Sequence, residues 1–161
     1  MSRAVLWSIH PEWCQKIVTW EKLLEVRKTI PRLAPPFKNY IYCTRAKAPF
    51  ALNADFGSIR TRGGVVIGEF VCPAVIDLRG LLNAPWPTMK GDGAVFLQGM
   101  VTKWAGLSEE EFKTYGGRYG VRISQLLIYR KPKPLGDFRY SSSGETLTRP
   151  PQSWCYVEPI K

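Results

Sequence analysis

The chain has 161 residues, a length typical of one domain. Hydrophobic residues make up 45% and aromatic residues 12%, which excludes a chain that is disordered throughout. No apolar run approaches the roughly 20 residues of a membrane-spanning helix, and the N-terminus does not resemble a signal peptide. Lys and Arg total 23 against 13 for Asp and Glu, so the net charge of +10 favours a polyanionic partner such as nucleic acid, a nucleotide or anionic lipid.

The cysteines stand far apart in the sequence, and His10 is the only histidine. Their spacing is not that of a zinc site, so the sequence predicts neither a metal centre nor a cofactor. Without a signal peptide we expect reduced, buried thiols in a cytoplasmic protein. A single histidine also disfavours a Ser-His-Asp or Cys-His catalytic arrangement, and His10 before Pro11 is typical of a helix cap or a turn.

The first half of the chain is predicted to contain short strands and one helix. The helix begins at Pro11, where apolar residues start to recur at helical spacing. In the next segment the residues alternate, which puts Leu24 on one strand face and Glu25 and Arg27 on the other. The predicted order is a strand at 4–9, a helix from 11 to 19–20, a strand at 22–28, a loop at 30–36, a strand at 37–43 and a polar connection at 44–64.

The second half has its strongest strand pattern at residues 65–72, which Pro73 interrupts and which residues 74–78 continue past a bulge. Ser108 and Glu111 have the spacing of a capping box at the start of a second helix. The remaining predicted elements are a strand at 121–129, an extended basic turn at 131–134, a loop at 141–144 and a final strand at 153–157.

Short strands dominate this order, and no βαβ rhythm or internal repeat recurs. We therefore predict an α+β fold: a mixed, curled sheet or small β-barrel with two or three short helices packed on it. The strands that carry Val5, Leu24, Ile41, Ile67 and Leu127 are expected to form one curled sheet around a shared core.

The residues around the first helix follow a known pattern. Ser8-Ile9-His10-Pro11 precede the helix, and Lys22, Glu25 and Arg27 follow it in the order Lys-x-x-Glu-x-Arg. This arrangement resembles the ASCH domain of the PUA-like superfamily, in which a strand, Ile-x-Pro, a helix and Gly-x-Lys-x-x-Glu-x-Arg succeed one another. Here Trp20 replaces the family's glycine, which ends the helix with a positive φ.

Later segments extend the resemblance. Residues 66–70 resemble the family's central strand, and residues 149–154 resemble the tail of a branch found in phages and prophages of Gram-positive bacteria. We therefore expect one ASCH-like, PUA-like domain over residues 1–161, with variable inserts at about 44–62 and 79–106.

The resemblance implies action on RNA, nucleotides or modified nucleosides. One branch of the family is an amidohydrolase that removes the acyl group from N4-acetylcytidine, and another member is a ribonuclease. The amidohydrolase branch has a threonine three residues after its lysine and a glutamate just before its second helix. In this chain those positions hold Glu25 and Ala105-Gly106.

Three residues match the motif, and a fourth carries a charge inside a strand. Lys22 can act as a base or bind phosphate, and Arg27 can hold a phosphate or carboxylate bidentately. Glu25 shares a strand face with Arg27 and can orient its guanidinium; the alternative is a surface ion pair. Glu69 is either a general acid or base, or a structural partner of Arg27.

Aromatic and basic residues add a second set of candidates. Trp20 is expected either to stack on a base or to fill a gap over the core. Together with Tyr40, Tyr42, Arg45 and Lys47 it forms a set typical of single-stranded RNA binding, although each cation can equally be a solvated loop charge.

The predicted function is binding of RNA, a nucleotide or a nucleoside in a cleft lined by Lys22, Glu25, Arg27 and Glu69. Two alternatives remain open at this point. One is a metal-free hydrolase acting on an N4-acylated cytidine or on RNA, with Lys22, Glu25 and Glu69 as its catalytic groups. The other is a phage-encoded protein that binds a host partner.

Overall fold

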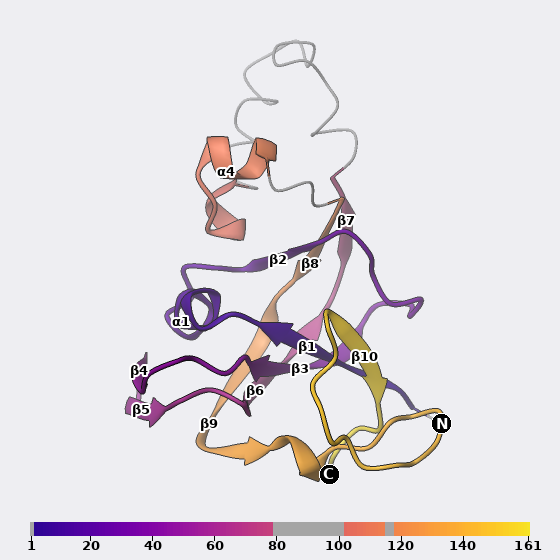
Figure 1. The fold of residues 1–161 in the computed structure, drawn as a ribbon. Coiled ribbons are helices and arrows are strands. Elements are labelled where there is room, and N and C mark those ends of the chain that lie inside the picture. The colour runs from indigo at the N-terminus through magenta and orange to yellow at the C-terminus, as the bar shows by residue number, and fades with distance from the viewer. Residues whose placement is uncertain (1, 79–101, 115–117) are drawn as a thin grey trace.

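A computed structural model of the chain describes residues 2–78, 102–114 and 118–161. Its centre is a five-stranded sheet in the order β10-β1-β3-β6-β9 (Figure 1). Parallel pairing joins β1 to β3, whereas the other neighbours are antiparallel. The strands of this central sheet are β1 (Ala4–Ile9), β3 (Phe37–Cys43), β6 (Val65–Cys72), β9 (Ser124–Pro134) and β10 (Trp154–Val157).

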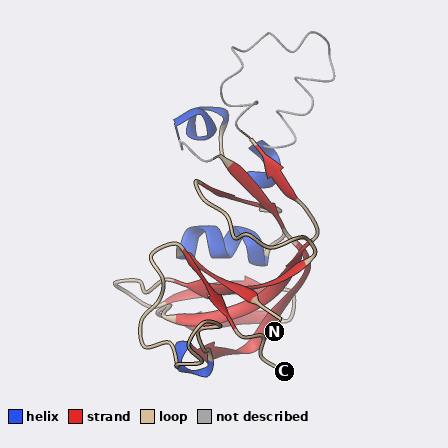
Figure 2. Ribbon diagram, turned by 90° about the vertical axis from the view of Figure 1, so that its right-hand side faces the viewer, coloured by secondary structure: helices blue, strands red, loops and turns tan. Residues whose placement is uncertain are grey.

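Both faces of the central sheet are covered, as expected for strands that are apolar on both sides. Val5 and Trp7 of β1 pack in the core under helix α1 (Pro11–Val18), and Leu6 packs on the other face with Phe138. Figure 2 shows α1 on one side of the sheet and the short 3-10 helix η1 (Leu135–Asp137) on the other. The crossover from β1 to β3 therefore runs through α1.

A second, three-stranded sheet has the order β2-β8-β7. Its strands are β2 (Leu24–Arg27), β7 (Val75–Asp77) and β8 (Tyr119–Arg122). Leu24 packs there with Val26 and Leu78, in a cluster separate from the core of the central sheet. The expectation that Leu24 would share one sheet with Val5 and Ile41 was wrong, and residues 74–78 do not continue β6.

The predicted strand at 121–129 is two strands in different sheets. The backbone N–H of Ile123 donates to the carbonyl of Leu23 in the second sheet, and the chain enters the central sheet at Ser124. Gln125 then has a φ of 48°, so the extended conformation is interrupted at the junction. The basic residues at 131–134, predicted as a turn, continue β9 instead.

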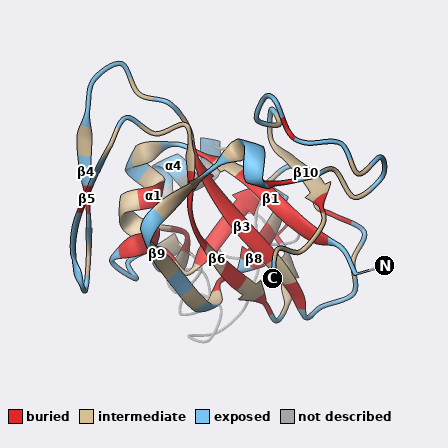
Figure 3. Ribbon diagram, turned by 90° about the horizontal axis from the view of Figure 1, so that it is seen from below, coloured by how far each residue is buried: buried red, intermediate tan, exposed pale blue. Residues whose placement is uncertain are grey.

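The structure differs from the prediction at two further places, the connection at 44–64 and the side chain of Leu127. That connection contains a hairpin of β4 (Phe50–Ala54) and β5 (Gly57–Thr61), which extends from the body of the domain in Figure 3. Leu52 and Ile59 anchor the hairpin in the core. Leu127, expected in the core, is 55% exposed.

The second predicted helix is present as α4 (Glu109–Thr114). Its capping box is confirmed, because the Ser108 hydroxyl accepts from the N–H of Glu111 at 3.1 Å and the Glu111 carboxylate accepts from the N–H of Ser108 at 2.7 Å. The α+β class with curled sheets and short helices is confirmed as well. Most of the expected insert at 79–106 lies outside the described residues.

The four cysteines are free thiols, three of them buried, as the sequence predicted. Among the described residues no helix is long and apolar enough to cross a bilayer.

The turn after α1 places a tryptophan in a left-handed conformation. Trp20 has a φ of 62° and its side chain is 45% exposed. This is the position at which the ASCH pattern has glycine, and the left-handed conformation costs an L residue about 1–2 kcal/mol. The helix is thus followed by a left-handed residue although that residue is a tryptophan.

We predict that Trp20→Gly will be more stable than Trp20→Ala by about 0.5–1 kcal/mol, because both remove the ring but only glycine relieves the backbone. Urea unfolding followed by circular dichroism measures the difference. An alanine variant as stable as the glycine variant, or more so, would contradict the strained turn.

Candidate functional site

A buried carboxylate, Glu25, lies between two cations of the sequence motif. The Nε atom of Arg27 donates to Glu25 Oε1 at 2.9 Å, and Lys22 Nζ lies 3.4 Å from Oε2. The carboxylate is 5% exposed. Glu25 and Arg27 share a face of β2, as the alternation predicted, whereas Lys22 reaches Glu25 from the turn before the strand.

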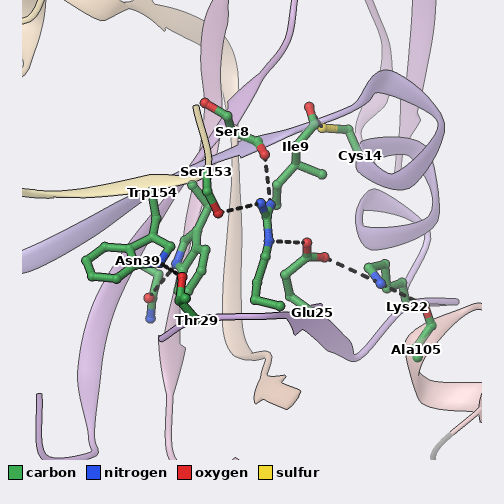
Figure 4. Close-up of polar contacts among 12 residues, drawn as sticks. Ser8, Ile9, Cys14, Lys22, Glu25, Thr29, Asn39, Ala105, Ser153 and Trp154 are labelled. Carbon is green, nitrogen blue, oxygen red and sulfur yellow. Dashed lines mark hydrogen bonds and ion pairs between the residues drawn. The ribbon is translucent and has the colours of Figure 1, made fainter. Parts of the chain in front are cut away.

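Lys22 is 4% exposed and points away from solvent. Its Nζ donates to the carbonyl of Ala105 at 2.7 Å, so it lies between Glu25 and Ala105 in Figure 4. Burial lowers the pKa of the Lys22 ammonium from its ordinary 10.5, and the attraction of Glu25 opposes this shift. The Lys22 ammonium is thus held between a carboxylate and a backbone carbonyl.

A second lysine holds the neighbouring carbonyl. Lys16 Nζ, from the last turn of α1, donates to the carbonyl of Gly106 at 2.9 Å. Gly106 has a φ of 68°, and a Cβ atom there would lie 3.3 Å from the Lys16 side chain. Two ammonium groups therefore fix the turn that leads into α4.

Arg27 connects β1 to the segment before β10. One terminal nitrogen of its guanidinium donates to the carbonyl of Ser8 at 2.8 Å, and the other donates to the hydroxyl of Ser153 at 3.2 Å. The hydroxyl of Ser8 in turn donates to the carbonyl of Pro151 at 2.6 Å. The guanidinium also lies 5.4 Å from the centre of the Trp7 ring, a cation–π distance.

A pocket of about 150 Å³ opens beside this guanidinium. It combines an aromatic wall, a charged pair and several neutral polar side chains. Its lining consists of Ser8, Ile9, His10, Trp13, Glu25, Arg27, Thr44 and Gln152. We refer to this cavity as the Arg27 pocket; Lys22 is not part of its lining.

Glu69, expected in the same cleft, lies on the opposite face of the central sheet. Its carboxylate accepts from the hydroxyl of Tyr129 and pairs with Lys38 at 2.9 Å. Lys38 in turn lies over the ring of Tyr40, which belongs to the core cluster on the face away from α1. The structure therefore brings Glu25 and Arg27 to the pocket and separates Glu69 from them.

The predicted aromatic set is divided in the same way. Tyr40 and Tyr42 are 0% and 5% exposed, so their rings are not available for stacking on a base. Trp20 is exposed, but it lies at the C-terminal end of α1, whereas the Arg27 pocket adjoins the N-terminal end. Arg45 and Lys47 are exposed and closely follow Thr44 of the pocket lining.

Sequence analysis missed several residues of the pocket. His10 was interpreted as a cap; it does occupy the N-cap position of α1, but its side chain makes no capping bond and lies 3.3 Å from the Thr44 hydroxyl. Ser8, Thr44 and Gln152 were not singled out. The available signal was the resemblance at 149–154, since this segment supplies Gln152 to the lining.

Comparison with protein-family models and with curated proteins finds no match. Among solved structures, the ASCH protein from Zymomonas mobilis superposes with a TM-score of 0.61 at 20% sequence identity, over 96% of this chain and 87% of that chain. Two point mutants of that protein give the same TM-score and identity, with 88% and 90% of their chains covered. This chain therefore has the fold of an ASCH protein, a PUA-like fold.

We predict that Glu25→Gln will destabilise the protein by about 3–5 kcal/mol at neutral pH, because the substitution leaves the buried Lys22 without its counter-charge. The loss is expected to shrink toward pH 10. The folded-state pKa of Lys22 lies below its unfolded value and falls further without Glu25. Between these two pKa values the unfolded state binds more protons, so stability rises with pH.

Urea unfolding of the variant and the parent at neutral and alkaline pH measures this difference. The double variant Glu25→Gln/Lys22→Met is the control, since it removes the unpaired cation and is expected to recover part of the loss at neutral pH. An equal loss at both pH values would contradict the role of the buried ammonium.

Proposed function

We propose that the chain is an ASCH-family domain that binds RNA or a nucleotide, with one base held in the Arg27 pocket. The observation that carries the proposal is the combination of an aromatic wall, a fixed guanidinium and neutral hydrogen-bonding side chains in one small cavity. Unpaired bases are recognised by stacking on aromatic rings or guanidinium planes and by hydrogen bonds to their edges.

The size and polarity of the Arg27 pocket support a single base. At about 150 Å³ it is smaller than the ~300–1,000 Å³ of typical ligand pockets, so it suits one compact planar group. Trp13 can supply the stacking face, and Thr44 and Gln152 can donate to or accept from a base edge. Arg27 keeps N–H donors beyond its three hydrogen bonds to Glu25, Ser8 and Ser153.

Exposed cations lie close in sequence to two of the residues that line the pocket. Arg45 and Lys47 follow Thr44, and Arg149 precedes Gln152 by three residues. A strand of RNA whose base enters the pocket would place its phosphates near such cations, and the net charge of +10 favours the encounter.

The C-terminal contribution to the pocket also supports the proposed branch of the family. Residues 149–154 gave the resemblance to phage and prophage proteins, and they supply Gln152 and the partner of Arg27, Ser153. We therefore propose that the chain belongs to that branch and acts in the cytoplasm.

We do not extend the proposal to hydrolysis. Lys22, the expected base, is directed toward Ala105 and Glu25 and does not line the pocket. Release of acetate from N4-acetylcytidine that disappears in Lys22→Ala would overturn the binding-only interpretation.

Gln152→Ala is expected to weaken binding of a short single-stranded RNA by about 5–30-fold, the equivalent of 1–2 kcal/mol for lost base contacts. Gln152 is exposed, so its removal should leave folding intact. Fluorescence anisotropy with labelled oligonucleotides measures the change. Arg139→Gln serves as the control, because Arg139 belongs to the segment that packs through Phe138 on the other face of the sheet. Equal RNA affinities of the parent protein and Gln152→Ala would contradict the proposal that a base binds in the Arg27 pocket.

A second expectation concerns salt. If Arg45 and Lys47 contact phosphates, each substitution by Gln should reduce the slope of log K against log salt by about 0.7 for a single strand. The same oligonucleotides titrated at several salt concentrations give these slopes. If the slopes are unchanged in both variants, or if binding does not depend on salt, the RNA phosphates do not contact Arg45 and Lys47.

A further inference from the structure

A second pocket lies at the other end of helix α1. It has a volume of about 200 Å³ and is lined by Val18, Trp20, Ala54, Asp55, Phe56, Leu126, Leu127 and Ile128. We call it the edge pocket. Among the described residues, the large hydrophobic side chains that are exposed are Trp20, Phe56 and Leu127, at 45%, 36% and 55%, and all three belong to its lining.

The exposed apolar side chains are gathered in one place and are not scattered over the surface. Scattered exposed hydrophobic residues are common, whereas a contiguous patch marks an interaction site. The Trp20 ring is moreover held outward by a left-handed backbone that glycine would adopt at lower cost. Neither burial of the ring nor the backbone conformation therefore favours a tryptophan at this position.

The edge pocket includes part of an unpaired sheet edge. In the described central sheet β9 is the last strand, and β6 is its one neighbour. Proteins protect such edges with charges and prolines, and residues 130–134 of β9 have the sequence Arg-Lys-Pro-Lys-Pro. Residues 125–129 contain neither a charge nor a proline, so this part of the edge lacks both protections, and only Gln125, with a φ of 48°, departs from extended backbone.

Charge distinguishes among possible occupants of the open edge. Three cations, Arg130, Lys131 and Lys133, follow directly along β9, and the strand contains no acid. A second copy of the chain would bring the same cations and a further charge of +10. An acidic segment is electrostatically complementary to this edge.

The lining also favours a peptide over RNA. Leu126, Leu127 and Ile128 give this side of the edge pocket an aliphatic surface, which suits the apolar side chains of a peptide and offers no side-chain hydrogen bonds to base edges. An added strand instead gains backbone hydrogen bonds along β9 and puts alternate side chains on the two faces of the sheet.

We propose that the edge pocket docks an extended, acidic segment of a protein partner. The segment adds a strand beside residues 125–129 of β9, inserts one large apolar side chain between Trp20 and Phe56, and sets acidic residues against Arg130, Lys131 and Lys133. This site is separate from the Arg27 pocket, since the two lie at opposite ends of a helix about 12 Å long.

The test uses a labelled peptide of sequence Glu-Asp-Val-Thr-Val-Phe-Val-Thr-Asp-Glu and the full chain. We expect saturable binding by fluorescence anisotropy, with slower amide hydrogen exchange at residues 125–129. Trp20→Gly and Trp20→Ala should both weaken binding about tenfold or more, although their stabilities differ. Leu127→Asp should abolish it, because it removes an apolar side chain of the lining and puts a charge of the same sign as the peptide on the edge. A peptide with Lys in place of Glu and Asp should bind about tenfold more weakly.

Gln152→Ala is the matched control, because it alters the Arg27 pocket and should leave peptide affinity unchanged. Failure of RNA binding would therefore not affect this test. The proposal is overturned if the peptide does not bind up to millimolar concentration, or if both Trp20 variants bind it with the affinity of the parent protein. It is equally overturned if oligouridylate displaces the peptide and needs Trp20, which would make the patch an RNA site. A concentration-dependent dimer that Leu127→Asp abolishes would show that a second copy occupies the edge.

Discussion

The carboxylate of Glu25 is the constraint on which the arrangement of the site depends. Both Lys22 and Arg27 pair with it, and without it the buried Lys22 ammonium would have no counter-charge, which costs several kcal/mol. Each cation then uses its remaining donors on backbone or hydroxyl groups of distant segments, Ala105 in one direction and Ser8 and Ser153 in the other. One buried negative charge thus fixes the second sheet, the turn before α4 and the tail relative to β1.

Helix α1 separates two surfaces with different chemistry. Its N-terminal end adjoins the polar Arg27 pocket, and its C-terminal end adjoins the apolar edge pocket. The chain segments that line them differ as well: β2 and the segment before β10 at the first, the β4–β5 hairpin and the start of β9 at the second. The proposed RNA ligand and the proposed acidic segment would therefore contact different side chains.

Sequence analysis recovered what local periodicity determines. Alternation in β2 correctly paired Glu25 with Arg27, and the capping box correctly began α4. Periodicity assigns a residue to a face but not a strand to a sheet, which is why β2 and Glu69 were misplaced. Tyr40 and Tyr42 look like stacking residues in a list of aromatics, yet both strand faces are covered and the rings are buried. The place of Gln152 in the pocket does not follow from periodicity, because it depends on contacts that the neighbouring Pro151 and Ser153 make with residues more than a hundred positions away.

Those distant contacts have a consequence for the order of folding. The hydrogen bond from Ser8 to Pro151 joins residues 143 positions apart, and that from Arg27 to Ser153 joins residues 126 apart. Because closing loops of this length costs entropy, we expect the wall formed by Gln152 to assemble late in folding. A chain in which residues 151–153 have not yet docked on β1 and β2 lacks this wall of the Arg27 pocket. On the proposed function, the basic surface could attract RNA before the domain has closed, whereas a base could be held in the Arg27 pocket only afterwards.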